Sequence, residues 1–389
     1  MVFPPPCVLG VAVSLSRFSF PCPIVFGAGA RMQVAAHLSE LGLRRPLIVT
    51  DRALASLPVL EQFKATLKGL QVGVYAGVQG NPTAAQVMAG AQAFRDHQAD
   101  AVIGFGGGAS LDVAKVVGLM ATHPGDIIEY AWDHPQVRTI SGPLPYFVAL
   151  PTTSGTGSEV GRSSVVSEND THHKRVIFSP HILARMVFAD PELTLGLPAA
   201  ITAATGMDAL THNLESYLSP AYHPLCDGIA LEGTRIAAAA LARAVHQPQD
   251  LQARSDMMMA SMMGAIAFQK DLGAVHSCAH ALGAVCDMHH GLANALMIDT
   301  VMDWNYEAVP ARFDERAHVC RVAGGGSAFV AWLRQLKQSI GITASLRNHG
   351  VGQQQLQALV AIATADGCHQ TNPRPCTAAD FERLFQAAL

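Results

Sequence analysis

Charged residues are scarce in this sequence, and several features that define common protein classes are missing. Only 14% of the 389 residues are charged, the formal net charge is −4, and the chain contains no basic run. Nucleic-acid-binding proteins rely on clustered lysine and arginine, so we expect no nucleic acid as a partner. No apolar run reaches the length of a membrane span, so we expect no membrane partner either. Half of the residues are hydrophobic, which is typical of a well-buried globular enzyme.

The cysteines also lack an informative spacing. The chain has eight of them and no CxxC pair. A chain of this length can fold without disulfides, so we expect reduced thiols and a cytoplasmic protein. The segment 1–13, MVFPPPCVLGVAV, has no basic start and contains a run of prolines, so we do not expect a signal peptide.

Length and periodicity predict two domains of different class. A chain of 389 residues is too long for one ordinary core. In the first half, short apolar runs alternate with helical patterns, which predicts a Rossmann-like parallel sheet. In the second half, long stretches rich in Ala, Leu and Met predict helices. We therefore expect an α/β NAD-binding domain over 1–192 and an all-helical metal-binding, catalytic domain over 193–389, packed over a cleft.

The ends of the predicted strands in the first half carry groups that suit a nucleotide. The run PLIVTD ends at Asp51, whose carboxylate can accept hydrogen bonds from ribose hydroxyls. The strand AVIGF continues into Gly106, Gly107 and Gly108 and then into a helix, a unit that can bind pyrophosphate. The usual GxGxxG fingerprint is absent, so a helix cap at Asp51 and a plain tight turn at the glycines remain alternatives.

The second half contains a concentration of histidines. Four of them lie in the mostly apolar segment 273–294: His276, His280, His289 and His290. Upstream, Asp208 and His212 are four residues apart, which places them on one face of a predicted helix. Imidazole is the commonest metal ligand in proteins, and three nitrogens with one carboxylate suit Fe(II) or Zn(II). A single histidine is more often structural, and spacing alone does not decide which of the four bind the metal.

Four ordered motifs resemble the iron-containing (group III) alcohol dehydrogenases, which share the dehydroquinate synthase-like fold. They are GGGASLDVAK, LPTTSGTGSEV, TGMDALTHNLESY and VHSCAHALG followed by HHGLANAL. The resemblance implies a metal-dependent oxidoreductase that transfers hydride between an alcohol and NAD, giving an aldehyde or ketone. The ion implied is Fe(II), with Zn(II) as the other candidate. Dimers are frequent among such enzymes, so we expect a homo-oligomer, a dimer.

The resemblance also implies roles for single residues. The implied metal ligands are Asp208, His212, His276 and His290. The implied cofactor contacts, from the adenosine ribose to the nicotinamide, are Asp51, Asn81, Gly107, Gly108, Asp112, Thr152, Thr153 and Lys174. His280 is then a non-ligand near the reacting centre and a candidate for proton transfer, and His289 is a neighbour of a ligand. A carboxylate at Asp51 favours NAD, because it would repel the 2′-phosphate of NADP.

The sequence departs from the family pattern at three places that concern the cofactor or the substrate. Ala109 replaces a serine and Gly161 replaces a threonine, and each change removes one hydroxyl near the cofactor. The segment FQKDLG before His276 is one residue shorter than usual and carries Lys270. Lys270 predicts an acidic substrate with a carboxylate or phosphonate group, although a solvated lysine is the alternative.

Three other functions compete with the dehydrogenase. One is a lyase of the dehydroquinate synthase type that uses NAD transiently, but that relative has a glutamate among its ligands. Another is a metal-free reductase similar to maleylacetate reductases, which the four matched ligands disfavour. A non-enzymatic nucleotide-binding protein would leave the metal motif unexplained.

Overall fold

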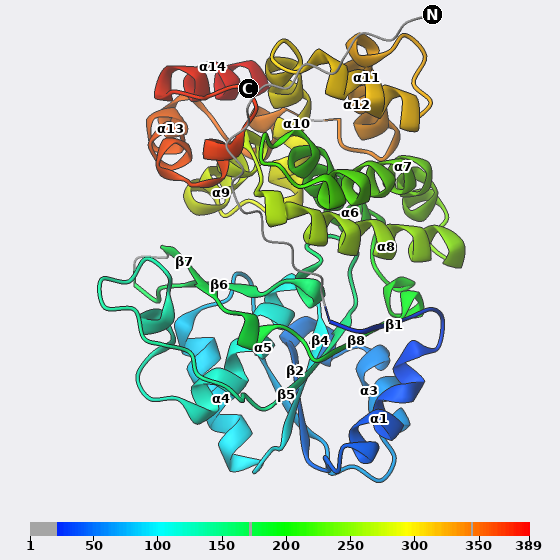
Figure 1. Ribbon diagram of the computed structural model, residues 1–389, viewed down its shortest axis with the longest axis vertical. Helices are drawn as coiled ribbons and strands as arrows, with labels where there is room; N and C mark the ends of the chain where they lie inside the picture. Colours follow the sequence, from blue (N-terminus) through cyan, green and yellow to red (C-terminus); the bar gives the residue numbers. More distant parts are fainter. Residues whose placement is uncertain (1–21, 171–172, 344) are drawn as a thin grey trace, which may run out of the picture.

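A computed structural model describes residues 22–170, 173–343 and 345–389. The expectation about a signal peptide concerns residues 1–13, which lie outside this range. The described chain forms an α/β lobe and an all-helical lobe, stacked along the long axis of the molecule (Figure 1). None of the helices in these ranges combines the length and apolar character that a bilayer crossing requires.

A parallel sheet lies at the centre of the α/β lobe, with the order β1-β8-β5-β4-β2-β3. Its strands are β1 (Ile24–Phe26), β2 (Pro46–Asp51), β3 (Gly73–Val78), β4 (Ala101–Gly106), β5 (Tyr146–Pro151) and β8 (Met186–Ala189). From β2 the chain moves outward to β3 and then returns to β4 on the other side of β2. Ligands of doubly wound sheets bind at such a reversal, beyond the carboxyl ends of the strands.

Helices cover both faces of the sheet. The helices of this lobe are α1 (Val34–Glu40), α2 (Arg52–Ala55), α3 (Pro58–Thr66), α4 (Ala84–Asp96) and α5 (Gly108–Thr122). In β4, Val102 packs into the cluster of α4 and α5, whereas Ile103 and Phe105 pack into that of α1 and α3. Burial on both faces explains why these strands are continuous apolar runs in the sequence.

A short antiparallel hairpin lies between the sheet and the helical lobe (Figure 1). It consists of β6 (Ser163–Ser167) and β7 (Lys174–Phe178). The next strand in the chain, β8, returns to the parallel sheet, so the hairpin is an excursion between β5 and β8.

After β8 the chain passes through η5 (Pro191–Thr194) into the helical lobe. Its helices are α6 (Ala199–Leu218), α7 (Pro224–His246), α8 (Leu251–Ala267), α9 (Ala274–Cys286), α10 (His290–Tyr306), α11 (Pro310–Val319), α12 (Gly326–Ser339), α13 (Leu356–Ala365) and α14 (Ala378–Ala388). Helix α6 is buried along almost its whole length and packs against α7, α8 and α10. The predicted fold class, a parallel-sheet lobe followed by a helical lobe, is confirmed.

Candidate metal centre and nucleotide edge

Four side chains from three helices converge at the predicted metal site. Helix α6 provides Asp208 and His212, α9 provides His276, and His290 is the first residue of α10. Asp208 Oδ1 lies 3.7 Å, 3.8 Å and 3.4 Å from the Nε2 atoms of His212, His276 and His290, respectively. One ligand atom from each of the four lies within 4.8 Å of the others.

This spacing fits a single small cation. Bonds of about 2.1 Å in a tetrahedral site place ligand atoms about 3.4 Å apart, close to the separations between Asp208 and the imidazoles. One carboxylate and three imidazoles form a donor set that binds iron or zinc. The geometry therefore fits a divalent ion.

The protonation states of His212, His290 and Asp208 also favour a cation. Burial lowers the pKa of His212 to about 4 and holds that of His290 well below its usual range, so both imidazoles are neutral at pH 7. Burial alone would raise the pKa of Asp208, but the neighbouring histidines lower it below its usual range. Neutral imidazoles and an ionised carboxylate are the forms that bind metal.

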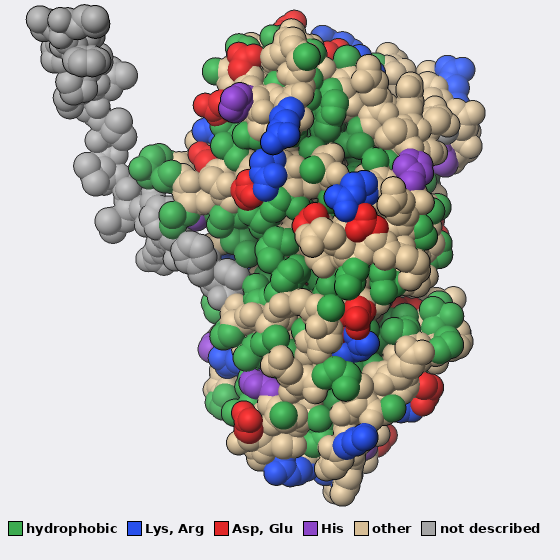
Figure 2. Space-filling view, turned by 90° about the vertical axis from the view of Figure 1, so that its right-hand side faces the viewer, with side chains coloured by type: hydrophobic (Ala, Val, Ile, Leu, Met, Phe, Trp, Pro, Cys, Tyr) green, Lys and Arg blue, Asp and Glu red, His purple; other side chains and the backbone are tan. Residues whose placement is uncertain are grey.

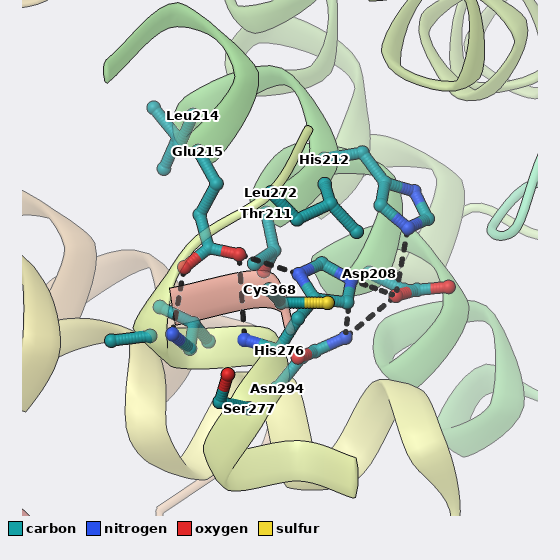
Figure 3. A network of polar contacts seen from close by, with 12 residues as sticks. Asp208, Thr211, His212, Leu214, Glu215, Leu272, His276, Ser277, Asn294 and Cys368 are labelled. Carbon is teal, nitrogen blue, oxygen red and sulfur yellow. Dashed lines mark hydrogen bonds and ion pairs between the residues drawn. The ribbon is translucent and has the colours of Figure 1, made fainter. Parts of the chain in front are cut away.

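Glu215, which the sequence reasoning did not single out, orients His276. Its Oε2 accepts a hydrogen bond of 2.6 Å from His276 Nδ1, and its Oε1 accepts one of 2.7 Å from the backbone N–H of Val275 (Figure 3). Although burial lowers the pKa of His276, bonds to Asp208 and Glu215 raise it to about 9. Because Glu215 occupies Nδ1, Nε2 is the nitrogen that faces Asp208. Outer-shell carboxylates of this kind fix the orientation of ligand histidines.

Asn294 is a second residue that the sequence reasoning did not assign. It lies one turn after His290 on α10, and its Nδ2 donates to Asp208 Oδ1 at 2.7 Å. The same Nδ2 lies 3.2 Å from His290 Nε2 and 3.4 Å from His276 Nε2. Asn294 therefore lies against three of the four predicted ligands, and Figure 3 shows it beside two of them, Asp208 and His276.

His280 and His289 are not part of this four-residue group. His280 lies one turn after His276 on α9, and its ring stacks on that of His290 with 5.4 Å between centroids. Its Nδ1 lies 2.8 Å from Asp366 Oδ2. Burial raises the pKa of Asp366, but the bonds from His280 and Ser277 hold it well below its usual range. His289 is exposed at the position before α10.

Asp51 lies at the carboxyl end of β2, beside the glycine turn that follows β4. One of its carboxylate oxygens caps α2, accepting from the N–H of Leu54 at 2.7 Å. The other oxygen has one long contact, 3.4 Å from Ser110 Oγ. Asp51 is thus both the predicted cap and a carboxylate with acceptor capacity at the point where strand order reverses.

The glycine turn packs closely against the loop that follows β5. A Cβ at Gly107 would lie 3.3 Å from Thr153, and a Cβ at Gly108 would lie 2.6 Å from Thr156. Thr152 is buried and bonds through its N–H to the carbonyl of Gly106 at 3.0 Å. The structure therefore brings the two predicted cofactor loops together, and a Cβ at Gly108 would displace the side chain of Thr156.

Asp112 bridges elements of the protein. One of its oxygens accepts from Ser158 Oγ at 2.5 Å and pairs with Lys115 Nζ at 3.3 Å. The other accepts from the N–H of Val165 in β6 at 3.0 Å. This carboxylate therefore connects α5 to the loop after β5 and to the hairpin, and it stabilises both in their positions beside α5.

Asn81 and Lys174 lie at opposite ends of the predicted nucleotide edge. Asn81 is exposed in the turn after β3. Lys174 begins β7, and its Nζ would lie 3.6 Å from a Cβ at Gly283 of α9. Burial lowers the pKa of Lys174, although Asp366 and Asp287 oppose this. Lys174 therefore extends from the hairpin to the helical lobe.

Lys270 is not a free cation, which argues against the expectation that it binds an acidic substrate. Its side chain is buried, and Nζ forms an ion pair with Asp227 of α7. Arg312 also pairs with Asp227, at 3.3 Å. The sequence alone does not show that Asp227, 43 residues earlier, would be opposite this lysine.

Comparison with known proteins identifies related sequences and structures over nearly the whole chain. The family model for iron-containing alcohol dehydrogenase matches residues 21–191, and the model for the C-terminal part of the Fe-containing family matches 202–389. A 4-hydroxybutyrate dehydrogenase from Cupriavidus necator is 38% identical over 93% of this chain and 96% of its own.

Two solved structures extend the comparison to three dimensions. A 1,3-propanediol oxidoreductase has a TM-score of 0.91 and 35% identity, covering 96% of this chain and 100% of its own. A sulfoacetaldehyde reductase from Bifidobacterium kashiwanohense, solved with NAD+, has a TM-score of 0.89 and 27% identity, with coverages of 96% and 99%. The similarity therefore includes both lobes.

Proposed function

The chain belongs to the iron-containing alcohol dehydrogenase family, and we propose that a divalent metal in the helical lobe and an NAD at the carboxyl edge of the sheet carry its reaction. It is an oxidoreductase that interconverts an alcohol and its carbonyl product. The lyase reading is not favoured, because the relatives are dehydrogenases and reductases. The convergence of Asp208 with His212, His276 and His290 carries the metal assignment.

Iron(II), the metal of the family name, would supply a Lewis acid for the hydroxyl oxygen, and NAD would supply the hydride acceptor. His212 and His290 offer neutral nitrogens, and Glu215 holds His276 with its Nε2 toward Asp208. Asp51 offers an acceptor to the ribose, and the glycine turn offers backbone N–H groups to the pyrophosphate. We propose that Thr152 and Thr153 contact the nicotinamide side of the cofactor, that Lys174 also contacts the cofactor, and that His280 takes the hydroxyl proton.

We propose a short primary alcohol with a second polar group as the substrate. The names of two relatives give 4-hydroxybutyrate and 1,3-propanediol as their substrates. Both compounds have a terminal hydroxyl, and they differ in charge at the other end. Lys270 is paired with Asp227. The side-chain ammonium of Lys174, by contrast, has no hydrogen bond among the described residues, so Lys174 is the cation available near the histidines. A panel of diols and hydroxy acids, assayed with Fe(II)- and Zn(II)-loaded protein, distinguishes the two classes.

The metal assignment is tested by replacing one ligand and its closest bystander. We expect His276→Ala to lose the bound metal and NADH formation together, because it removes one of four ligands. His289→Ala is the matched control, since His289 is exposed and adjacent to His290. Metal content and NADH formation at the wild-type level in His276→Ala would refute the assignment.

The domain boundary, the cellular location and the oligomeric state are also proposals. We place the domain boundary at residue 192, within η5, where the chain leaves the sheet. We propose a cytoplasmic protein, supported by the described cysteines, which form no disulfide with one another. We propose a dimer because β1 is an edge strand, whose outer side is unpaired in the described structure. Light scattering in solution tests the dimer.

A further inference from the structure

A second cluster of polar groups lies beside the predicted metal ligands. It contains His280 on α9, Asp366 at the end of α13 and Cys368 in η9 (Cys368–Thr371), with one potential ligand atom of each within 4.8 Å of the others. His280 and Asp366 are 86 residues apart in the sequence. The His280 side chain is 31% exposed, so this cluster reaches the surface that a substrate would approach.

The two oxygens of Asp366 have different surroundings. Oδ1 accepts from the N–H of Cys368 at 2.8 Å and from Ser277 Oγ at 2.8 Å. Ser277 Oγ itself accepts from the N–H of His369 at 3.0 Å, so its own proton is directed to Asp366. Oδ1 is therefore held by two fixed donors, and Oδ2 faces His280 Nδ1 at 2.8 Å.

An ionised carboxylate only accepts hydrogen bonds, so the His280 nitrogen that faces Asp366 must carry the proton. In the neutral ring, Nε2 is then the unprotonated nitrogen. Nε2 has no hydrogen bond among the described residues, and it lies across the ring from Asp366. The surroundings of Asp366 thus determine both the orientation of the ring and its tautomer.

We infer that Asp366 is the positioning residue of His280 and keeps Nε2 ready to accept the hydroxyl proton of the alcohol. This inference rests on the proposed role of His280. In the oxidation direction the O–H bond breaks and its proton goes to Nε2, while the hydride leaves carbon for NAD. His280 then carries a proton on each nitrogen, Asp366 stabilises the imidazolium, and the exposed edge returns the proton to water.

The substitution Asp366→Asn tests this with almost no change in shape. Because the N–H of Cys368 and the hydroxyl of Ser277 require an acceptor, the amide oxygen would take the place of Oδ1. The amide NH2 would then face His280 Nδ1 and move the ring proton to Nε2. We expect kcat to fall by about 100-fold or more, with KM and metal content within about twofold of wild type. Asp366→Glu should recover part of kcat, because it restores an acceptor.

A second measurement does not depend on activity. In zinc-loaded protein labelled with 15N-histidine, we expect the His280 proton on Nδ1 in the wild type and on Nε2 in Asp366→Asn. Glu215→Gln is the contrasting variant, because it acts on a metal ligand and should change metal content. A wild-type proton on Nε2 would overturn the inference.

The proton transfer by His280 and the positioning by Asp366 are tested separately. If His280→Gln keeps full kcat, the proposed proton transfer by His280 is wrong, and the inference falls with it. If His280→Gln is impaired but Asp366→Asn has wild-type kcat, only the positioning role is wrong. We expect the double variant to be no slower than His280→Gln alone, because both changes remove the same proton acceptor.

Discussion

Glu159, in the loop after β5, should make stability depend on pH near neutrality. Its side chain is 2% exposed, and no hydrogen-bond partner is found for its Oε1 in the described structure. Lys115 is nearby, but its Nζ already bonds to Ser158 Oγ at 2.7 Å and pairs with Asp112. Burial raises the pKa of Glu159 from its ordinary 4.5 to about 7, although Lys115 opposes the rise.

The rise corresponds to about 3 kcal/mol, because one pH unit is equivalent to about 1.36 kcal/mol. Below pH 4.5 the carboxyl is protonated in both the folded and the unfolded chain. As pH rises toward 7, the unfolded chain loses this proton while the folded chain keeps it, so the free energy of unfolding falls. Above about pH 7 the carboxyl is ionised in both the folded and the unfolded chain, and the stabilisation that it provides at low pH is lost in full.

The substitution Glu159→Gln removes this titration and keeps the shape. We expect the variant to gain stability relative to wild type as pH rises from 5 to 8, by about 3 kcal/mol at most. Urea unfolding at several pH values, with equal metal loading, measures the difference. Glu61→Gln is the control, because Glu61 is exposed and pairs with Lys64, so its effect should be small. A constant difference between Glu159→Gln and wild type across this range would refute the reasoning.

Three further predictions concern metal binding, the ion pair of Lys270 and the binding of NAD. Glu215→Gln should weaken metal binding about 10- to 100-fold, measured by competition with a chelator, because it loosens His276. Lys270→Met should lower the free energy of unfolding by about 1.5–3 kcal/mol in a urea titration, because it removes one charged partner of Asp227, which is partly exposed and keeps Arg312. We expect the KM ratio between 4-hydroxybutyrate and 1,3-propanediol to stay unchanged, and a changed ratio would contradict the burial of Lys270. Asp51→Ser should raise KM for NAD about tenfold and narrow the preference over NADP, measured by initial rates.

The sequence allowed prediction of the elements that local pattern determines. Apolar runs and glycines located β2 and β4, and the spacing of Asp208 and His212 placed both on one face of α6. Glu215 follows His212 by three residues, so it lies on the same face and could have been found by extending that pattern. Spacing did not separate the histidines after α8, because a turn with Asp287 in the left-handed conformation divides α9 from α10. Only the family resemblance distinguished His276 and His290 from their neighbours.

Contacts between distant segments could not be predicted in this way. Lys270 was expected to bind a substrate, because its partner Asp227 lies on α7, 43 residues earlier in the sequence. Asp112 stays a predicted cofactor contact, but the sequence does not show that Ser158 Oγ and the N–H of Val165 bond to its oxygens. In both cases a charged side chain finds its partners through tertiary packing, which local periodicity does not record.

Helix α9 carries two histidines one turn apart, and each is paired with a carboxylate from another segment. The residues around each pair distinguish the roles of the two histidines. Glu215 binds Nδ1 of His276, and Asp366 binds Nδ1 of His280, so in each ring Nε2 is the nitrogen left for chemistry. His276 is buried between α6 and α10, where its Nε2 meets Asp208. His280 is partly exposed beside Asp366 at the end of α13, and its Nε2 has no hydrogen bond among the described residues. This contrast supports our proposal that the same carboxylate–histidine pairing makes His276 a metal ligand, where four side chains converge, and His280 a proton acceptor, where the ring is partly exposed.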